Sequence, residues 1–264
     1  MKHTALSSTI AALLLTTVAH AAPIATEEFI YPPGGIAGQN GGSGFTSVWR
    51  GGGTVGAVGQ TYPGLFTDGG GFVSNGDNSG NYRDLGTSYG ADGTTIFVSL
   101  LISAQAGFSN TNPHYAGLSL LSGGDGNERL FLGQTFQSGN YGFERNGAVA
   151  QVSGEPVSTA STFLVAEINF LAGADTVSLY INPTVGFAAP DVIPTTNSVA
   201  DFNFDRIRIQ SGFNTAPFKF DEVRIGTTYA DVSPAPVPEP TSMILLGISG
   251  AALLARRRRG EISV

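Results

Sequence analysis

The sequence predicts an all-β body that folds as an antiparallel β-sandwich. Its apolar residues come in short runs separated by Gly, Asn, Asp and Pro, and the chain has 37 Gly and 14 Pro among 264 residues. Such runs between turn-forming residues are typical of strands. Residues 175–181 alternate between polar and apolar positions, so Val177, Leu179 and Ile181 share one face of a strand. No part of the body keeps a 3.6-residue apolar period over three helical turns, which favours a sandwich over alternating strands and helices.

The first 21 residues are typical of a secretory signal peptide. A short basic head precedes the apolar run Ile10–Val18, and Ala19 and Ala21 form an A-x-A cleavage site before Ala22. The alternative is an amphipathic first helix of the body, but the run has no polar face. We therefore expect export and a body that begins at residue 22.

Ten strands are expected in the body, which we place at residues 22–232. Each is a short apolar or alternating run bounded by turn-forming residues. The expected strands are Glu28–Tyr31, Gly44–Trp49, Thr94–Ile102, Ala116–Leu121, Arg129–Leu132, Tyr141–Glu144, Phe163–Phe170, Thr176–Ile181, Arg206–Gln210 and Phe218–Ile225.

The last two expected strands have closely similar sequences. In residues 202–209 and again in residues 218–225, the apolar residues shift from even to odd positions at an acidic residue. A strand that changes phase must twist or insert a β-bulge, so we predict bulges at Asp205–Arg206 and Asp221–Glu222. The charged side chains that follow are expected in solvent, in ion pairs worth under about 1 kcal/mol. They are Arg206, Arg208, Glu222 and Arg224.

The charge and the residue types exclude several function classes. The formal net charge is −7, and five of the 13 basic residues, Lys2 and Arg256–Arg259, lie at the two ends. The body between them is more acidic still and repels phosphate backbones, so we expect no nucleic-acid partner. The chain has no Cys, and His114 is the one His beyond the signal peptide. A zinc site built on His and Cys is therefore excluded.

Two glycine motifs are interpreted as turns. Gly86–Gly90 fits the G-x-S-x-G pattern of a nucleophile elbow, but a strand and not a helix follows it. Gly51–Gly56 fits G-x-G-x-x-G, but Pro63 and the glycines before it exclude the helix that would hold a pyrophosphate. Neither motif predicts a catalytic residue.

The acidic residues do not form a recognisable catalytic pair. Glycoside hydrolysis needs two carboxyl groups about 5 to 9.5 Å apart across the scissile bond. Asp221 and Glu222 are adjacent, so on a regular strand they face opposite sides. We expect no catalytic residue and no enzyme activity. The alternative is a polysaccharide hydrolase or lyase whose carboxylates meet from distant loops.

Calcium is the one cofactor that the loops suggest. Gly- and Asn-rich loops can place oxygen atoms around a hard cation. Their spacing matches no EF-hand, and Asp in a turn commonly bonds its own backbone instead. We predict no defined metal ligands, and the loops leave open whether Ca²⁺ is bound. The acidic and amide residues in these loops are Asp68, Asp77, Asp84, Asp92, Asp125, Asn127 and Glu128.

The C-terminal end is a tether followed by a short apolar segment. Alternate prolines in Val232–Pro240 favour an extended polyproline II conformation. The 15 apolar or small residues 241–255 reach about 22 Å as a helix, which is short of a hydrocarbon core of about 30 Å. Flanking polar side chains can cover the difference, and Arg256–Arg259 should stay cytoplasmic. This order predicts a short membrane anchor with the body outside.

The same segment resembles a known sorting signal. Pro238, Glu239, Pro240 and Thr241, then an apolar helix, then Arg256, Arg257, Arg258 and Arg259, resemble the PEP-CTERM signal of Gram-negative bacteria. The resemblance implies that an exosortase recognises the tail and cleaves near Pro-Glu-Pro. It divides the end into a linker (233–240), a transmembrane helix with its arginines (241–259) and a tail (260–264).

The body also resembles a known fold family at its two ends. Residues 29–49, which end at Trp49, and residues 220–232 are similar to the ends of laminin-G-like, concanavalin-type jelly rolls. The resemblance implies a jelly roll whose first and last strands are neighbours. We expect Trp49 to line the core or a cleft, with a sugar-stacking platform as the alternative.

Together these features predict an exported protein without catalytic activity. It would be anchored transiently in the inner membrane with the body outside, and then reside in the envelope or extracellular matrix. The expected partners are the secretion machinery, an exosortase and an extracellular polysaccharide. We expect glycan binding or a structural role, and a passive filler or adhesin without a specific ligand is the third possibility.

Overall fold

The computed structural model describes most of the body. The predicted signal peptide and the chain beyond residue 236 lie outside the described residues, and so does Asp77. The described residues are 22–75, 79–108, 114–136, 138–145, 150–212 and 218–236.

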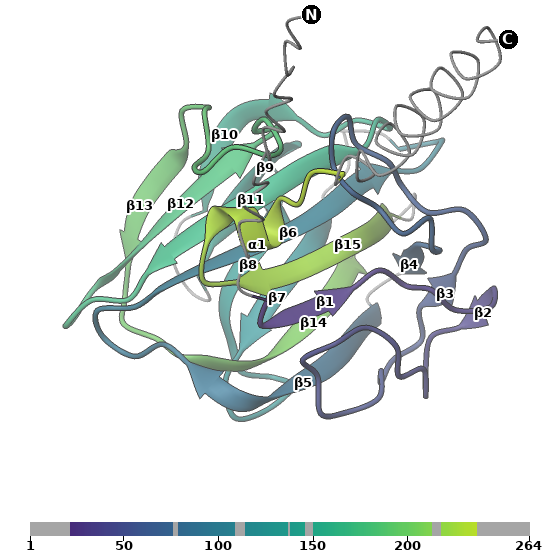
Figure 1. The fold of residues 1–264 in the computed structure, drawn as a ribbon, viewed down its shortest axis with the longest axis horizontal. Helices are drawn as coiled ribbons and strands as arrows, with labels where there is room; N and C mark the ends of the chain where they lie inside the picture. The colour runs from purple at the N-terminus through teal and green to yellow at the C-terminus, as the bar shows by residue number, and fades with distance from the viewer. Residues whose placement is uncertain are drawn as a thin grey trace, which may run out of the picture.

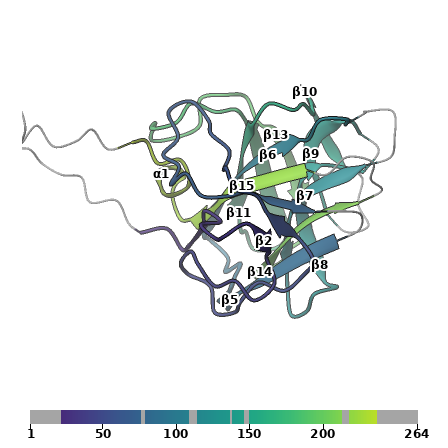
Figure 2. The same cartoon turned by 90° about the vertical axis from the view of Figure 1, so that its right-hand side faces the viewer.

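The body is an all-β sandwich of two antiparallel sheets, as predicted (Figures 1 and 2). We call the sheet with nine strands in the described residues the large sheet, and the one with six strands the small sheet. The large sheet runs in the order β13 (Thr195–Val199), β12 (Asp175–Ile181), β11 (Thr162–Asn169), β6 (Thr95–Ala104), β15 (Phe218–Gly226), β4 (Val73–Asn75), β3 (Thr54–Val55) and β2 (Gly34–Gly35), with β1 (Ala25–Glu27) also paired to β15. The small sheet runs β10 (Gln151–Pro156), β9 (Asn140–Glu144), β8 (Glu128–Gln134), β7 (Tyr115–Leu121), β14 (Phe204–Gly212) and β5 (Ser79–Tyr89).

The first and last strands are neighbours, which confirms that expectation. Ala25 on β1 pairs with Ile225 on β15, and Glu27 pairs with Val223. Eight of the ten predicted strands correspond to observed strands within a few residues.

Two predicted strands near the start are wrong. Within 28–31, Phe29 adopts φ +50, which ends β1 at Glu27. Residues 44–49 form an irregular segment, joined to β5 through the single bridge between Arg50 and Tyr82. Strands β5, β10 and β13 were not predicted because their sequences are largely polar.

The central strands β6 and β11 of the large sheet are buried on both faces. In β6, Ile96, Val98, Leu100 and Ile102 pack between the two sheets, while Leu101 packs on the outer face. Along β11, successive residues likewise pack alternately between the two sheets and on the outer face. Where both faces of a strand are covered, polar and apolar residues no longer alternate along it, and its sequence is a continuous apolar run.

The pairing register shifts at both positions where a bulge was predicted. In β15, two residues between Asp221 and Arg224 oppose one residue of β6, which is the predicted bulge. Between Phe204 and Arg206 of β14, the extra residues lie instead on the partner strand β5. Phe204 and Phe220 before the shifts, and Ile207 and Val223 after them, all reach the same core, so the apolar side chains stay inward where the sequence changes phase.

Two of the four charges expected in solvent are instead buried. Glu222 and Arg224 are 1% and 3% exposed and form an ion pair with each other. Residues 56–72 cover the outer face of the large sheet at this point, and the Arg224 guanidinium donates to the Phe66 carbonyl at 3.1 Å. On the small sheet Arg206 and Arg208 stay partly exposed.

A layer of loops and one short helix covers the outer face of the large sheet. Helix α1 (Tyr229–Val232) packs with Leu65, Leu101 and Phe163 in a second, smaller apolar cluster. Figure 1 shows α1 over β6 and β11, and Figure 2 shows the start and the end of the described chain on this same side. No helix in the described residues is long and apolar enough to cross a membrane. The predicted transmembrane helix at 241–259 lies outside them.

The first part of the predicted tether is held against the body. Val232 is buried, and its carbonyl accepts from Ser99 Oγ at 2.9 Å. The Phe66 amide donates to the Pro234 carbonyl at 2.8 Å. The extended tether predicted from residue 232 is therefore shorter than expected, because its first residues form part of the loop layer.

Candidate functional site

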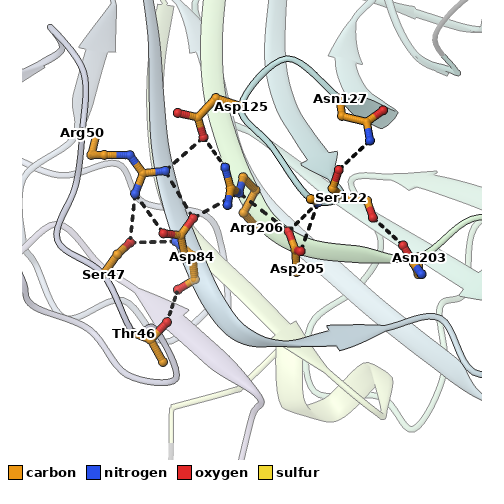
Figure 3. Close-up of polar contacts among 11 residues, drawn as sticks. Thr46, Ser47, Arg50, Asp84, Ser122, Asp125, Asn127, Asn203, Asp205 and Arg206 are labelled. Carbon is orange, nitrogen blue, oxygen red and sulfur yellow. Dashed lines mark hydrogen bonds and ion pairs between the residues drawn. The ribbon is translucent and has the colours of Figure 1, made fainter.

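Arginines and aspartates alternate at the edge of the small sheet (Figure 3). Asp84 lies on β5 and Arg206 is its register partner on β14, so the two side chains meet across paired strands. Arg50 comes from the irregular segment that bridges to β5, and Asp125 comes from the turn between β7 and β8. We call these four residues the Arg–Asp cluster.

Each carboxylate of the cluster contacts both arginines. Arg50 donates to the two oxygens of Asp84 at 2.9 and 3.2 Å, and Arg206 Nε lies 3.1 Å from Asp84. Arg50 also donates to Asp125 at 3.0 Å, and Arg206 forms a second ion pair with Asp125. The arrangement fixes the planes of two guanidinium groups at a partly exposed surface.

The arginines of the cluster lower the pKa of Asp84. Burial by itself would raise the pKa of Asp84, but the Arg50 hydrogen bonds and the nearby charge of Arg206 outweigh burial and lower it. Hydrogen bonding to Asp84 is also the largest cause of the raised pKa of Arg50. Asp84 is therefore a hydrogen-bond acceptor at neutral pH and cannot donate a proton.

Main-chain and amide contacts fix the turn that carries Asp125. Asp205 accepts from the Gly123 amide at 3.0 and 3.2 Å, and Asn127 Nδ2 donates to the Ser122 carbonyl at 2.6 Å. Ser122 Oγ in turn donates to Asn203 (Figure 3). These bonds join the turn to the start of β14, so the side chains around it are pre-positioned.

Two open hollows flank the start of β14. The first, of about 370 Å³, lies beside a bulge of β5, where four residues of β5 oppose one residue of β14. Its lining is made of hydroxyl, carboxylate and guanidinium groups together with one glycine: Thr46, Asp84, Gly86, Thr87, Ser88, Asp205 and Arg206. The second, of about 310 Å³, is lined by Gly90, Asp92, Arg129, Asp201, Phe202 and Asn203.

Four of the candidate calcium ligands lie close together. Three of these four, however, pair with arginine side chains. Asp84 and Asp125 are paired with Arg50 and Arg206, and Glu128 with Arg208. Asn127 instead closes the turn. Within the described ranges no group of three or more His, Asp and Glu side chains is arranged to hold a metal ion. Asp92 lines the second hollow, and Asp68 lies in the loop layer on the other sheet.

Other residues singled out in the sequence lie away from the cluster. Trp49 is a core residue that donates Nε1 to Glu27 at 2.8 Å, so the sugar-stacking alternative for Trp49 is wrong. His114 is buried against the Phe108 ring. The G-x-S-x-G match lies in β5 and its bulge, and the G-x-G-x-x-G match includes β3, so no helix follows either motif.

The sequence analysis missed Arg50, Ser47 and Thr46 as site residues. Thr46 and Ser47 lie in the segment wrongly predicted as a strand, and Arg50 follows that segment directly. Ser47 Oγ accepts a hydrogen bond from the Asp84 amide at 2.9 Å. The run of turn-forming and hydroxyl residues before Trp49 was the available signal for an irregular segment.

A second polar cluster lies on the outer face of the small sheet. Glu128 forms an ion pair with Arg208 and accepts from Ser119 at 2.6 Å and Gln210 at 3.1 Å. Burial, and next the negative charge of Glu128, raise the pKa of Glu144 on the neighbouring strand. The face therefore combines a carboxylate that is paired with an arginine and one whose pKa is raised.

Comparison with known proteins identifies the C-terminal segment. Residues 236–259 match the family model described as the PEP-CTERM protein-sorting motif. The chain carries a PEP-CTERM sorting motif. This motif covers the Pro-Glu-Pro, the apolar stretch and the arginines that the sequence analysis assigned to one signal. No curated protein matches the chain.

Solved structures resemble the body in fold alone. Three of them are the botulinum neurotoxin serotype D binding domain, the metal-free Emp46p carbohydrate recognition domain and the endo-1,3-beta-glucanase from Streptomyces sioyaensis. Their TM-scores are 0.49, 0.42 and 0.44, with identities of 13%, 10% and 10%. The matches cover 78%, 68% and 79% of this chain and 48%, 88% and 98% of those chains, so this chain spans about half the length of the first.

Proposed function

We propose that this protein is exported, sorted through its tail and retained in the extracellular matrix, where its body binds polysaccharide without cleaving it. The observation that supports the binding role is the pair of hollows beside the Arg–Asp cluster. Their linings combine fixed carboxylate and guanidinium groups with hydroxyl and backbone groups.

These groups suit the hydroxyls of a neutral sugar. An ionised carboxylate accepts hydrogen bonds from hydroxyls and a guanidinium donates them, so together they can bind vicinal diols. The hollow volumes, about 370 and 310 Å³, lie at the small end of the range for ligand sites. Because Asp84 stays ionised, this site supports binding and not acid catalysis.

Replacing both hydroxyl residues of the first hollow tests the binding role. We expect Thr87→Ala with Ser88→Ala to weaken binding to a matrix polysaccharide about tenfold, because two exposed hydrogen-bonding groups are lost without disturbing the core. Thr159→Ala, an exposed threonine in another loop, is the matched control. The measurement is a pull-down over a polysaccharide panel followed by calorimetry. Equal binding by the double variant and the control would reject this hollow as the binding site.

A polysaccharide hydrolase is the second candidate, and the pair of Glu128 and Glu144 favours it. Glycosidases combine a carboxyl group of raised pKa with a second carboxylate, and the pKa of Glu144 is raised. Unlike the loop-borne pair considered from sequence, these residues lie on β8 and β9. If the activity exists, reducing ends appear from a polysaccharide panel and Glu144→Gln abolishes them. No release from any substrate removes this candidate.

A further inference from the structure

Exposed apolar side chains lie on the two loops that contact the chain where it leaves the body. Phe66, Phe187 and Ile193 are 44%, 56% and 97% exposed. They belong to the two loops, residues 56–72 and 182–194, that cover the outer face of the large sheet. We call these three side chains the exit patch. Large exposed apolar side chains that cluster on one face mark contact surfaces.

Contacts of the last described residues place the chain exit at these loops. The Phe66 amide donates to the Pro234 carbonyl at 2.8 Å. Gly186, next to Phe187, lies against Ala235, where an added Cβ would come within 3.1 Å of the Ala235 Cβ. Tyr229 of α1 donates to the Thr184 carbonyl of the same loop at 2.8 Å.

Little chain remains between this exit and the apolar part of the sorting motif. The motif match begins at residue 236, which is the last described residue, and the apolar segment begins at Thr241. Residues 237–240 span about 12 Å even in the extended polyproline II conformation. The headgroup layer on each side of a bilayer takes up roughly 5 to 8 Å of that distance. A body anchored by this segment is therefore held within a few ångströms of the lipid surface.

The charge of the two loops favours an apolar contact over an electrostatic one. Residues 56–72 and 182–194 contain no Lys or Arg, and Asp68 and Asp191 are their only charged residues. A surface that binds anionic headgroups through charge carries clustered basic residues instead. Phenylalanine and isoleucine can enter the boundary between headgroups and acyl chains.

We propose that the exit patch rests on the lipid bilayer while the tail is inserted, so that the outer face of the large sheet faces the membrane and the small sheet faces away. The inference rests on the proposed function, because it requires the tail to anchor the body. It adds a defined orientation in which Phe66, Phe187 and Ile193 contact lipid and the Arg–Asp cluster, on the other sheet, stays open to polysaccharide.

Single-cysteine labelling of residues 22–264, with the sorting motif still attached, tests this orientation. Because the sequence has no Cys, Phe187→Cys and Ile193→Cys each carry one environment-sensitive fluorophore. The matched control is Val152→Cys on β10 of the small sheet, which is 42% exposed and also apolar. Each variant is placed in phosphatidylcholine nanodiscs that hold one copy, with or without lipids spin-labelled near the headgroup.

The expected result is a blue shift and about twofold or greater quenching at positions 187 and 193, with neither change at position 152. The signal should survive 1 M salt, because no basic residue contributes. Adding Phe66→Ser to the Ile193→Cys variant should reduce the quenching. Unchanged quenching would mean that the tether alone holds the body near the membrane, and it would overturn the apolar contact.

Three other outcomes would each contradict a different part of the proposal. Equal signals at positions 187 and 152 overturn the orientation while leaving anchoring and glycan binding intact. A shift that occurs only in vesicles holding many copies assigns the patch to a second copy of the chain and overturns the lipid contact. Failure of the chain to co-float with vesicles contradicts the proposed anchoring itself.

Discussion

At the scale of single residues, one buried ion pair fastens the start of the chain to the small sheet. Glu27 on β1 is fully buried and pairs with Arg83 on β5. Its carboxylate also accepts from Tyr31 and Trp49, both at 2.8 Å. The Arg83 guanidinium further donates to Asn40 at 3.0 Å. Burial, then the neighbouring charge of Glu27, raise the pKa of Tyr31 to about 12, so its hydroxyl remains a donor.

Removing this carboxylate should strongly destabilise the body. Glu27→Ala leaves the Arg83 charge buried without its counterion, and breaking a buried pair in this way costs about 3 to 5 kcal/mol. Urea unfolding followed by Trp49 fluorescence measures the change. Glu155→Ala, at an exposed position on β10, serves as control and should change the free energy of unfolding by at most about 0.5 kcal/mol. A loss below about 1 kcal/mol for Glu27→Ala would contradict this role of the pair.

At the scale of elements, the bulge in β15 collects acidic groups beneath residues 56–72. Asp221 accepts from the Gln60 amide at 2.6 Å, and Glu222, which has φ +52, pairs with Arg224. Burial raises the pKa of Asp221 to about 8, and burial also raises the pKa of Glu222 to about 7 despite the opposing charge of Arg224. The bulge thus holds one loop of the layer that covers the large sheet.

This bulge should make stability fall as the pH rises from about 5 to 9. Because the folded protein binds these two protons more tightly than the unfolded chain, their contribution is greatest below the unfolded pKa values. It is lost as the pH passes about 7 and then about 8. Each group contributes a slope of up to about 1.4 kcal/mol per pH unit.

Asp221→Asn isolates the contribution of one of these groups. The stability advantage of the native chain over Asp221→Asn should shrink between pH 5 and pH 9, because only the native chain loses a proton at residue 221. Urea unfolding at each pH measures both proteins. A pH-independent difference would show that Asp221 does not titrate in the folded protein.

A strand could be predicted from the sequence where its inward-facing residues are apolar. The phase shifts in 202–209 and 218–225 predicted where the pairing registers shift, because apolar side chains must reach one core, but not that the extra residues of the first shift lie on β5. Strand β5 could not be predicted in the same way. Asn81 and Arg83 occupy inward positions that an alternating strand fills with apolar residues, and only Glu27 and neighbouring polar groups make Arg83 acceptable there.

At the scale of the whole molecule, the two broad faces differ in character. Loops and α1 cover the large sheet, and the chain leaves the body through this layer. The small sheet instead carries the Arg–Asp cluster and the pair of Glu128 and Arg208. This division separates the proposed membrane contact from the proposed glycan site.

The mature protein should have lost both of its terminal signals. Cleavage before Ala22 and near Pro238–Pro240 predicts a product that spans residues 22 to about 240, because the A-x-A site and the sorting motif mark the two cuts. Intact mass of the protein from its native host measures both termini at once. A mass that still includes the four arginines would contradict processing of the tail.

The sequence by itself determined the sandwich, the bulge in β15 and the sorting motif, because strand periodicity and targeting signals are local patterns along the chain. Tertiary structure alone decided where the charges lie. Glu222 and Arg224 are buried and Arg206 is not, although they occupy similar positions in two similar strands, because a distant loop covers one sheet and leaves the other open. The Arg–Asp cluster has the same origin, since Arg50, Asp84, Asp125 and Arg206 meet only when four separate segments pack.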